Sequence, residues 1–120
     1  MHLNKIKLTK DASDRLKQLK ARTGLTPNIL SRIGFCMSLS DPAIPDPGEY
    51  PEEDREFNRY TLLGEWDALY VAMLRQRMLN DELPDDAVEV DYFRAHLNRG
   101  VIALSRQVKS IADLASLAIT

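Results

Sequence analysis

The chain has 120 residues, enough for one small domain but too few for two independent hydrophobic cores, so we expect a single domain over residues 1–120. Hydrophobic residues make up 44% of the chain and charged residues 28%, which argues against global disorder and against a fibrous protein. The net charge is −2, no apolar run is long enough to cross a membrane, and the start lacks a signal-peptide pattern, so we expect a cytoplasmic protein without membrane association.

The net charge hides a strong asymmetry along the chain. Residues 1–36 contain eight Lys or Arg and two acids, residues 37–92 contain four and fifteen, and the last 28 residues contain four and one. Such a distribution predicts one face that meets a polyanion and another that stays in water or meets a basic partner.

Residues 3–39 are predicted to form a basic extended arm followed by a pair of helices. Polar and apolar residues alternate over KIKLT at residues 5–9, which is typical of a short strand. In such a strand Lys5 and Lys7 point outward together, away from the apolar side.

The two helices of this pair have recognisable ends. We expect the first to be capped by Asp11 or Ser13 and to end at Gly24, a residue suited to the left-handed conformation that follows many helices. Thr26 is a natural N-cap for the second helix, over about residues 27–39, because the proline that follows it fits the first helical position.

The middle of the chain alternates between breaks and weaker patterns. Residues 40–51 contain four of the six prolines, which predicts a surface loop, and residues 56–64 are predicted to form a short extended segment over the core. A helix over about residues 65–79 is expected from apolar residues that recur at helical spacing. Its predicted buried stripe consists of Trp66, Leu69, Tyr70, Met73, Leu74 and Met78.

The last segment, about residues 91–118, is predicted to be one long helix or two helices joined near Gly100. Apolar or small residues recur there at steps of three and four, close to a heptad pattern. This stripe is either a core seam within one subunit or a surface that partly packs against another subunit. Its members are Phe93, Leu97, Val101, Leu104, Val108, Ile111, Ala115 and Ala118.

The sequence contains little that supports catalysis. Only His2 and His96 are available as imidazole bases; the first lies at the terminus, and we expect the second to be a half-buried structural or surface histidine. The single cysteine, Cys36, rules out a disulfide within the chain, and its apolar neighbours predict a buried thiol. The spacing of the acidic runs matches neither an EF-hand nor a nuclease site, so we predict solvated acidic loops, with no enzyme activity, no metal site and no cofactor.

Polyanion binding has better support from the residues themselves. The first part of the chain combines a basic arm, a basic helix and a capped helix start at residues 26–28, and both cationic side chains and helix N-termini bind phosphate oxygens. The alternative is that these cations only solvate a helix face. The candidate DNA-binding residues are Lys17, Lys20, Arg22, Lys5, Lys7 and Lys10.

The order of arm, helix, Thr-Gly turn and helix over residues 3–39 resembles a ribbon-helix-helix unit. That resemblance implies paired N-terminal strands in the major groove and a phosphate at the second helix start. The fold class predicted from the whole sequence is mainly α, a small helical domain with a short N-terminal extended arm and a first third of this kind. A transcriptional regulator or antitoxin of the ribbon-helix-helix type is therefore one possible function.

Three longer stretches resemble a different family. LKARTGLTPNILSRIGFCMSLSDP, EFNRYTLLGEWDALYVAMLRQRM and HLNRGVIALSRQV together are similar to the DNA sulfur-modification protein family DndE. The resemblance implies a helical homotetramer that binds DNA, with a preference for nicked duplex, within the bacterial phosphorothioation machinery. It also implies partnership with the other Dnd proteins: a cysteine desulfurase, an iron–sulfur protein and an ATPase.

The family's DNA-binding lysines are carried onto the N-terminal basic positions of this chain. Lys17 and Lys20 match best, Arg22 follows, and the lysines of the arm and helix start come last. The chain is thus expected to be an accessory subunit that contacts the DNA backbone without reading bases. A protein-interaction scaffold that makes no DNA contact is the remaining alternative.

Overall fold

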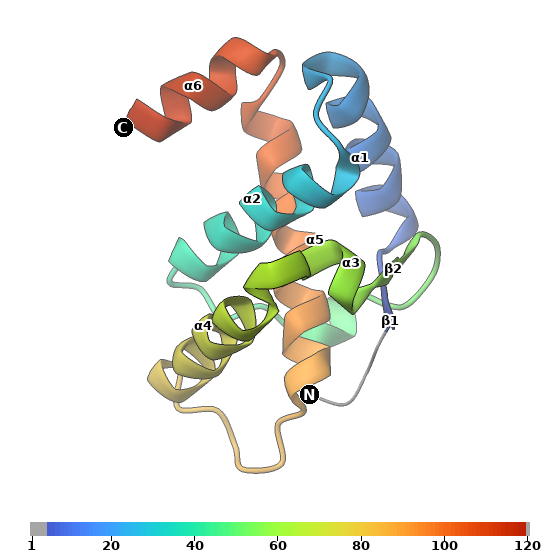
Figure 1. Cartoon of the computed structure of the whole chain (residues 1–120). Coiled ribbons are helices and arrows are strands. Elements are labelled where there is room, and N and C mark those ends of the chain that lie inside the picture. The colour runs from blue at the N-terminus through green and yellow to red at the C-terminus, as the bar shows by residue number, and fades with distance from the viewer. Residues whose placement is uncertain (1–4, 120) are drawn as a thin grey trace.

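The computed structural model describes residues 5–119, with side chains up to residue 117. The described chain is mainly helical, as the sequence predicts (Figure 1). Its elements, in chain order, are β1 (Lys5–Lys7), α1 (Lys10–Thr23), α2 (Pro27–Ser40), η1 (Pro47–Glu49), β2 (Glu56–Asn58), α3 (Arg59–Leu63), η2 (Gly64–Trp66), α4 (Asp67–Asn80), α5 (Glu89–Gln107) and α6 (Ile111–Ile119). None of the described helices is long and apolar enough to cross a membrane.

Local signals set the limits of α1 and α2. Thr9, and not Asp11 or Ser13 as predicted, caps α1: its side chain accepts a hydrogen bond from the Ala12 N–H. Ser13 is instead buried against the loop before β2. The end of α1 at Gly24, which adopts a φ of 77°, and the Thr26 cap of α2 are confirmed.

The centre of the molecule is the crossing of α2 over α5, the most extensive contact between any two described elements (Figure 1). The backbones meet at Gly34 and Gly100: a Cβ on Gly34 would lie 2.8 Å from the Gly100 carbonyl carbon, and a Cβ on Gly100 would overlap the Gly34 carbonyl. The prediction left open one long helix or two helices joined near Gly100; the structure has two helices, but they are not joined at Gly100. The glycine lies inside an unbroken helix because the crossing needs the space of a missing side chain, and the break comes at residues 108–110.

A two-stranded antiparallel sheet covers one side of the core. Ile6 of β1 is opposite Phe57 of β2, and both are buried. The segment predicted to be extended over residues 56–64 is therefore a strand only at its start, and it becomes helix α3 at Arg59 because Asn58 caps that helix with its side chain. In the described chain β1 is paired within its own subunit, unlike the arm of a ribbon-helix-helix unit.

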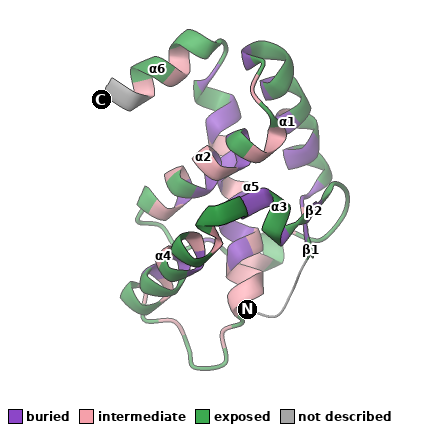
Figure 2. Ribbon diagram, viewed as in Figure 1, coloured by how far each residue is buried: buried purple, intermediate pink, exposed green. Residues whose placement is uncertain are grey.

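The buried side of α4 differs from the predicted stripe. Leu74 and Val71 are buried, but Trp66 and Leu69 are 51% and 52% exposed. Leu69 precedes Leu74 by five residues and so lies about 140° from it around the helix, too far for both to face one core. Figure 2 shows the exposed outer side of α4.

The apolar stripe of the C-terminal segment is buried as far as Val108 and no further. Ile111, the first residue of α6, is 56% exposed, and Ala115 is also exposed. The break at residues 108–110 turns α6 away from the axis of α5, so the spacing continues while the buried face does not (Figures 1 and 2). The prediction that part of this stripe packs against another subunit stays a prediction.

Candidate nucleic-acid interface

The basic residues of α1 lie on two sides of the helix. The buried side is formed by Ala12, Leu16 and Leu19, which leaves the opposite side to solvent (Figure 2). With 100° between successive residues, Lys17 and Lys20 lie about 60° apart, whereas Arg22 lies about 160° from Lys20. The predicted cluster is thus divided between a lysine flank, defined here as Lys17 and Lys20, and an opposite flank that carries Arg22.

The lysine flank is exposed, and its charges are not neutralised by the protein. Neither Lys17 nor Lys20 forms an ion pair with any acid among residues 5–117, and the same holds for Arg22. Asp14 precedes Lys17 by three residues without pairing with it. An exposed, unpaired ammonium group can contact a phosphate without first breaking an ion pair within the protein.

The three lysines nearer the N-terminus lie beside acids. The Lys5 ammonium group is 3.8 Å from the Glu56 carboxylate, and Lys7 is opposite Glu56 in the sheet register. Both lysines line a small hollow together with Glu52 and Asp91. The backbone N–H of Lys10 donates to Glu53 Oε1 at 3.3 Å. These three residues are therefore in a less positive setting than the lysine flank.

The turn into α2 offers fewer free donors than its sequence suggests. The Ile29 N–H is already directed at the Thr26 hydroxyl, 3.4 Å away, and the Asn28 side-chain amide donates to the Thr61 carbonyl at 3.5 Å. Part of the polar capacity at this helix start is thus used within the chain.

Arg55 is held against the first half of α1, a position that no local sequence pattern indicates. Its N–H donates to the Ser13 hydroxyl at 3.1 Å, and its carbonyl accepts from the Leu8 N–H at 2.8 Å. Ser13 precedes Lys17 by one helical turn on the same side of α1, so these bonds place the backbone of Arg55 one turn from Lys17. Within EEDREFN the arginine looks like part of the acidic middle, because its proximity to α1 is purely tertiary.

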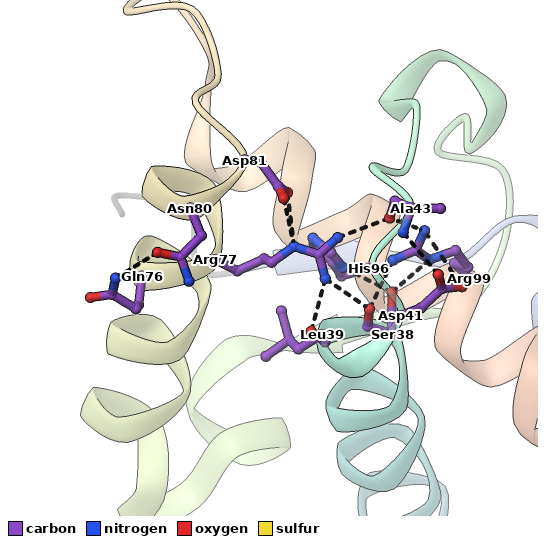
Figure 3. A network of polar contacts seen from close by, with 10 residues as sticks. All are labelled: Ser38, Leu39, Asp41, Ala43, Gln76, Arg77, Asn80, Asp81, His96 and Arg99. Atoms are coloured by element: carbon purple, nitrogen blue, oxygen red, sulfur yellow. Dashed lines mark hydrogen bonds and ion pairs between the residues drawn. The ribbon is translucent and has the colours of Figure 1, made fainter.

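Two further cations, the buried Arg77 and the partly buried Arg99, lie at the carboxyl end of α2 and are called the buried cluster below (Figure 3). Arg77 of α4 donates to the carbonyls of Leu39 and Ala43 at 2.8 and 2.9 Å and pairs with Asp81. Arg99 of α5 donates to the carbonyls of Ser38 and Ala43 at 2.8 and 2.6 Å. Both arginines thus satisfy carbonyls at or just beyond the end of α2, which carry partial negative charge.

His96 lies inside this network. It is fully buried, not half-buried as predicted, and its Nδ1 is 2.8 Å from the Ser38 hydroxyl, which accepts from Arg99 Nε at 2.8 Å. Burial, assisted by the charges of Arg99 and Arg77, lowers the pKa of His96 to about 4. A serine beside a neutral histidine has the chemistry of a nucleophile and base, but both side chains are closed off from solvent, so the pair supports the fold.

Three further expectations concern the remaining candidate groups. Cys36 is exposed on α2, so the predicted buried thiol was wrong: the α2 surface that carries it lines a groove, and does not face the core. His2 lies outside the described residues. Among residues 5–119, no three His, Cys, Asp or Glu side chains are grouped closely enough to hold a metal ion.

Comparison with known proteins identifies the family and the fold of this chain. The family model described as DNA sulphur modification protein DndE matches residues 5–112. The crystal structure of DndE from Escherichia coli B7A, involved in DNA phosphorothioation modification, has a TM-score of 0.68 and 28% identity, over 87% of this chain and 98% of that one.

A DndE mutant involved in DNA phosphorothioation, with two glycines replaced by lysine, has a TM-score of 0.62 over 85% of this chain and 99% of that one. Its identity of 24% supports the fold alone. No curated protein matches the chain. The family match spans nearly all the described elements, and this chain therefore belongs to the DndE family.

Proposed function

We propose that this chain is a DNA-binding accessory subunit of the bacterial phosphorothioation machinery. It would grip the backbone of nicked or intact duplex DNA through Lys17 and Lys20. The observation that carries the proposal is the lysine flank, where two exposed ammonium groups lie on one side of α1 without an acidic partner in the described chain. Membership of the DndE family supports the role in the machinery.

The other basic residues would contribute less. Arg22 lies on the opposite flank and would reach a different phosphate, while Lys5, Lys7 and Lys10 work against neighbouring acids. Phosphate contacts carry no sequence information, so binding would be nearly indifferent to sequence and would weaken steeply as salt rises. A ribbon-helix-helix regulator is less well supported, because β1 is already paired with β2 of its own chain.

The proposal includes an assembly. Residues 1–120 would act as one DndE-like domain in a cytoplasmic homotetramer, alongside the other Dnd proteins. The acidic loop between α4 and α5 would stay away from DNA by repulsion and is suited to meet a basic partner. The exposed apolar start of α6, at Ile111, is suited to subunit packing.

Titration of nicked and intact duplex at several salt concentrations tests the proposal. With Lys17→Ala/Lys20→Ala, we expect weaker binding and a log–log salt slope shallower by about 1.8, since each neutralised phosphate contributes about 0.9. Arg106→Ala/Lys109→Ala is a matched control, because it removes the same charge from exposed positions at the carboxyl end of α5 and just after it, where Ser105 contacts Arg15 of α1 and not the lysine flank. Unchanged affinity in the first variant, or an equal loss in both, would exclude this site.

The same experiment separates the alternatives. A footprint confined to one palindromic operator would favour a sequence-specific regulator. A complete lack of salt-dependent DNA binding by the wild type would favour a protein-interaction scaffold. Mass measurement of the assembly would test the homotetramer, and burial of the lysine flank between subunits would contradict the DNA contact.

A further inference from the structure

We propose that Arg55 is a further phosphate-contacting residue, so that the DNA-contact surface spans two elements, α1 and the start of β2. This inference rests on the proposed function, because it extends the surface that begins with Lys17 and Lys20. Three features of Arg55 support it: the position of its backbone, the contact of its side chain with an aromatic ring, and the lack of an ion pair in the described residues.

The backbone of Arg55 is held between the arm and α1. Its carbonyl accepts from the Leu8 N–H at 2.8 Å, and its N–H donates to the buried hydroxyl of Ser13 at 3.1 Å. Around α1, Ser13 lies about 40° from Lys17, on the side where Lys20 is also found. The backbone of Arg55 is therefore fixed one helical turn from Lys17, although the two residues are 38 positions apart in the sequence.

The side chain of Arg55 is ordered by an aromatic ring. Its guanidinium carbon is 5.0 Å from the centre of the Phe57 ring, and that ring is itself buried opposite Ile6 in the sheet. A guanidinium that lies over a ring keeps its N–H groups directed outward in its own plane, where they can meet two oxygens of one phosphate. Less side-chain freedom is then lost on binding.

The charge of Arg55 is unusual for its part of the chain. The other three arginines of residues 37–92 each pair with a carboxylate: Arg59 with Asp67, Arg75 with Glu89 and Arg77 with Asp81. Arg55 makes no ion pair within the described residues, although acids surround it in the sequence.

Two of those neighbouring acids are engaged elsewhere. Glu53 accepts from the Lys10 N–H, and Glu56 faces Lys5. The fold thus engages these two acids elsewhere and leaves the Arg55 guanidinium exposed, while the Arg55 backbone lies one helical turn of α1 from Lys17. A ligand with closely spaced negative charges, such as a DNA backbone, matches this arrangement.

The test compares Arg55→Ala and Arg55→Lys with the wild type, using a nicked duplex of arbitrary sequence over a range of salt. We expect Arg55→Ala to lower the affinity about five- to tenfold and to reduce the salt slope by about 0.9. Arg55→Lys should keep the slope, because the charge remains, but recover only part of the affinity, because the paired donors are lost.

Arg75→Ala is the matched control, since Arg75 is also an exposed arginine but lies on α4 and is paired with Glu89. It should bind like the wild type, and all variants should keep the helical circular dichroism of the wild type. Wild-type binding by folded Arg55→Ala, or an equal loss in Arg75→Ala, would overturn the role of Arg55. The proposed function would then still stand on Lys17→Ala/Lys20→Ala, whereas failure of the wild type to bind would remove both.

Discussion

The arginines at the carboxyl end of α2 and the lysines on the outer flank of α1 carry the same charge in opposite surroundings. Arg77 and Arg99 are directed at carbonyls and carboxylates inside the fold, and Arg77 donates to α2 and to the loop after it besides its own carboxylate partner. Lys17 and Lys20 are exposed and unpaired in the described chain. A cation of the first kind stabilises the fold, and a cation of the second kind is available to a ligand.

This contrast shows that a count of charges along the sequence does not distinguish cations that stabilise the fold from cations that are available to a ligand. The arginines of the buried cluster come from α4 and α5, in stretches that differ in net charge, and meet only because α2 ends between them (Figure 3). Burial lowers the pKa of Arg99, because the charged guanidinium loses hydration inside the fold. Its hydrogen bonds to the carbonyls offset that loss. The exposed lysine flank does not lose hydration in this way.

The largest loss of stability is expected from a substitution where α2 and α5 cross. The backbones are closest there, and the same crossing brings Arg99 to the end of α2. Gly100→Ala places a Cβ into the Gly34 carbonyl, so the helices must separate. We expect a loss of more than about 5 kcal/mol in the free energy of unfolding, enough to prevent cooperative folding. Denaturant unfolding measures it.

Gly24→Ala is the matched control, because its Cβ would meet no atom within 4 Å although its φ is 77°. That variant should lose only about 1 kcal/mol, from the left-handed backbone alone. A Gly100→Ala protein that unfolds like Gly24→Ala would show that the crossing is not as close as described.

The second prediction compares the loss of stability on replacing Arg77 and Arg75, two arginines of α4. Arg77→Ala removes hydrogen bonds to the carbonyls of Ser38, Leu39 and Ala43 and leaves the largely buried Asp81 without its cation, so we expect a loss of about 3–5 kcal/mol. Arg75→Ala, which breaks a surface pair with Glu89, should cost no more than about 1 kcal/mol. Chemical denaturation of both variants checks the difference, and equal losses would contradict the assigned role of the buried cluster.

The third effect depends on pH. Below about pH 6.5 the unfolded state takes up a proton on His96, while in the fold the pKa of His96 is about 4, so stability should fall between these values as pH decreases. The contribution reaches at most about 3 kcal/mol. Arg99 and Arg77 disfavour the imidazolium, and Asp81 and Asp41 favour it less strongly.

Unfolding free energies of wild type and His96→Gln, measured between about pH 7 and pH 4, isolate this contribution from that of other groups. The difference in unfolding free energy between the two proteins should become smaller as pH falls, because only the wild type contains the His96 imidazole, whose protonation favours the unfolded state. Parallel profiles would mean that His96 titrates normally.

The smallest effect is expected on the outer flank. Lys17→Ala/Lys20→Ala should change the free energy of unfolding by no more than about 0.5 kcal/mol, since neither side chain has a partner to lose in the described chain. Thermal or denaturant unfolding of the variant checks this. A large loss of stability would show that the lysines serve the fold, and would weaken their role in binding.

Features set by neighbouring residues in the sequence could be predicted, and the others could not. Gly24, Thr26 and Pro27 determine the turn between α1 and α2 by local backbone chemistry, and that turn was predicted correctly. Gly100 looked like a helix break, because only its contact with Gly34 explains why it lies inside a helix.

The candidate site divides in the same way. Lys17 and Lys20 stood out because they crowd a helix face that has few acids, but the separation of Arg22 from them required the helix to be placed against the core. Arg55 had no local signal at all. Its position depends on a bond to Ser13, 42 residues earlier, and on the diversion of Glu53 and Glu56.

The crossing of Gly34 and Gly100 also has a consequence for how the chain reaches its fold. The two residues are 66 positions apart, so their contact closes a long loop that contains β2, α3 and α4. Closing such a loop costs chain entropy before any packing is gained, which slows folding relative to a bundle of sequential helices. We expect β2, α3 and α4 to complete their packing only after α2 and α5 have met.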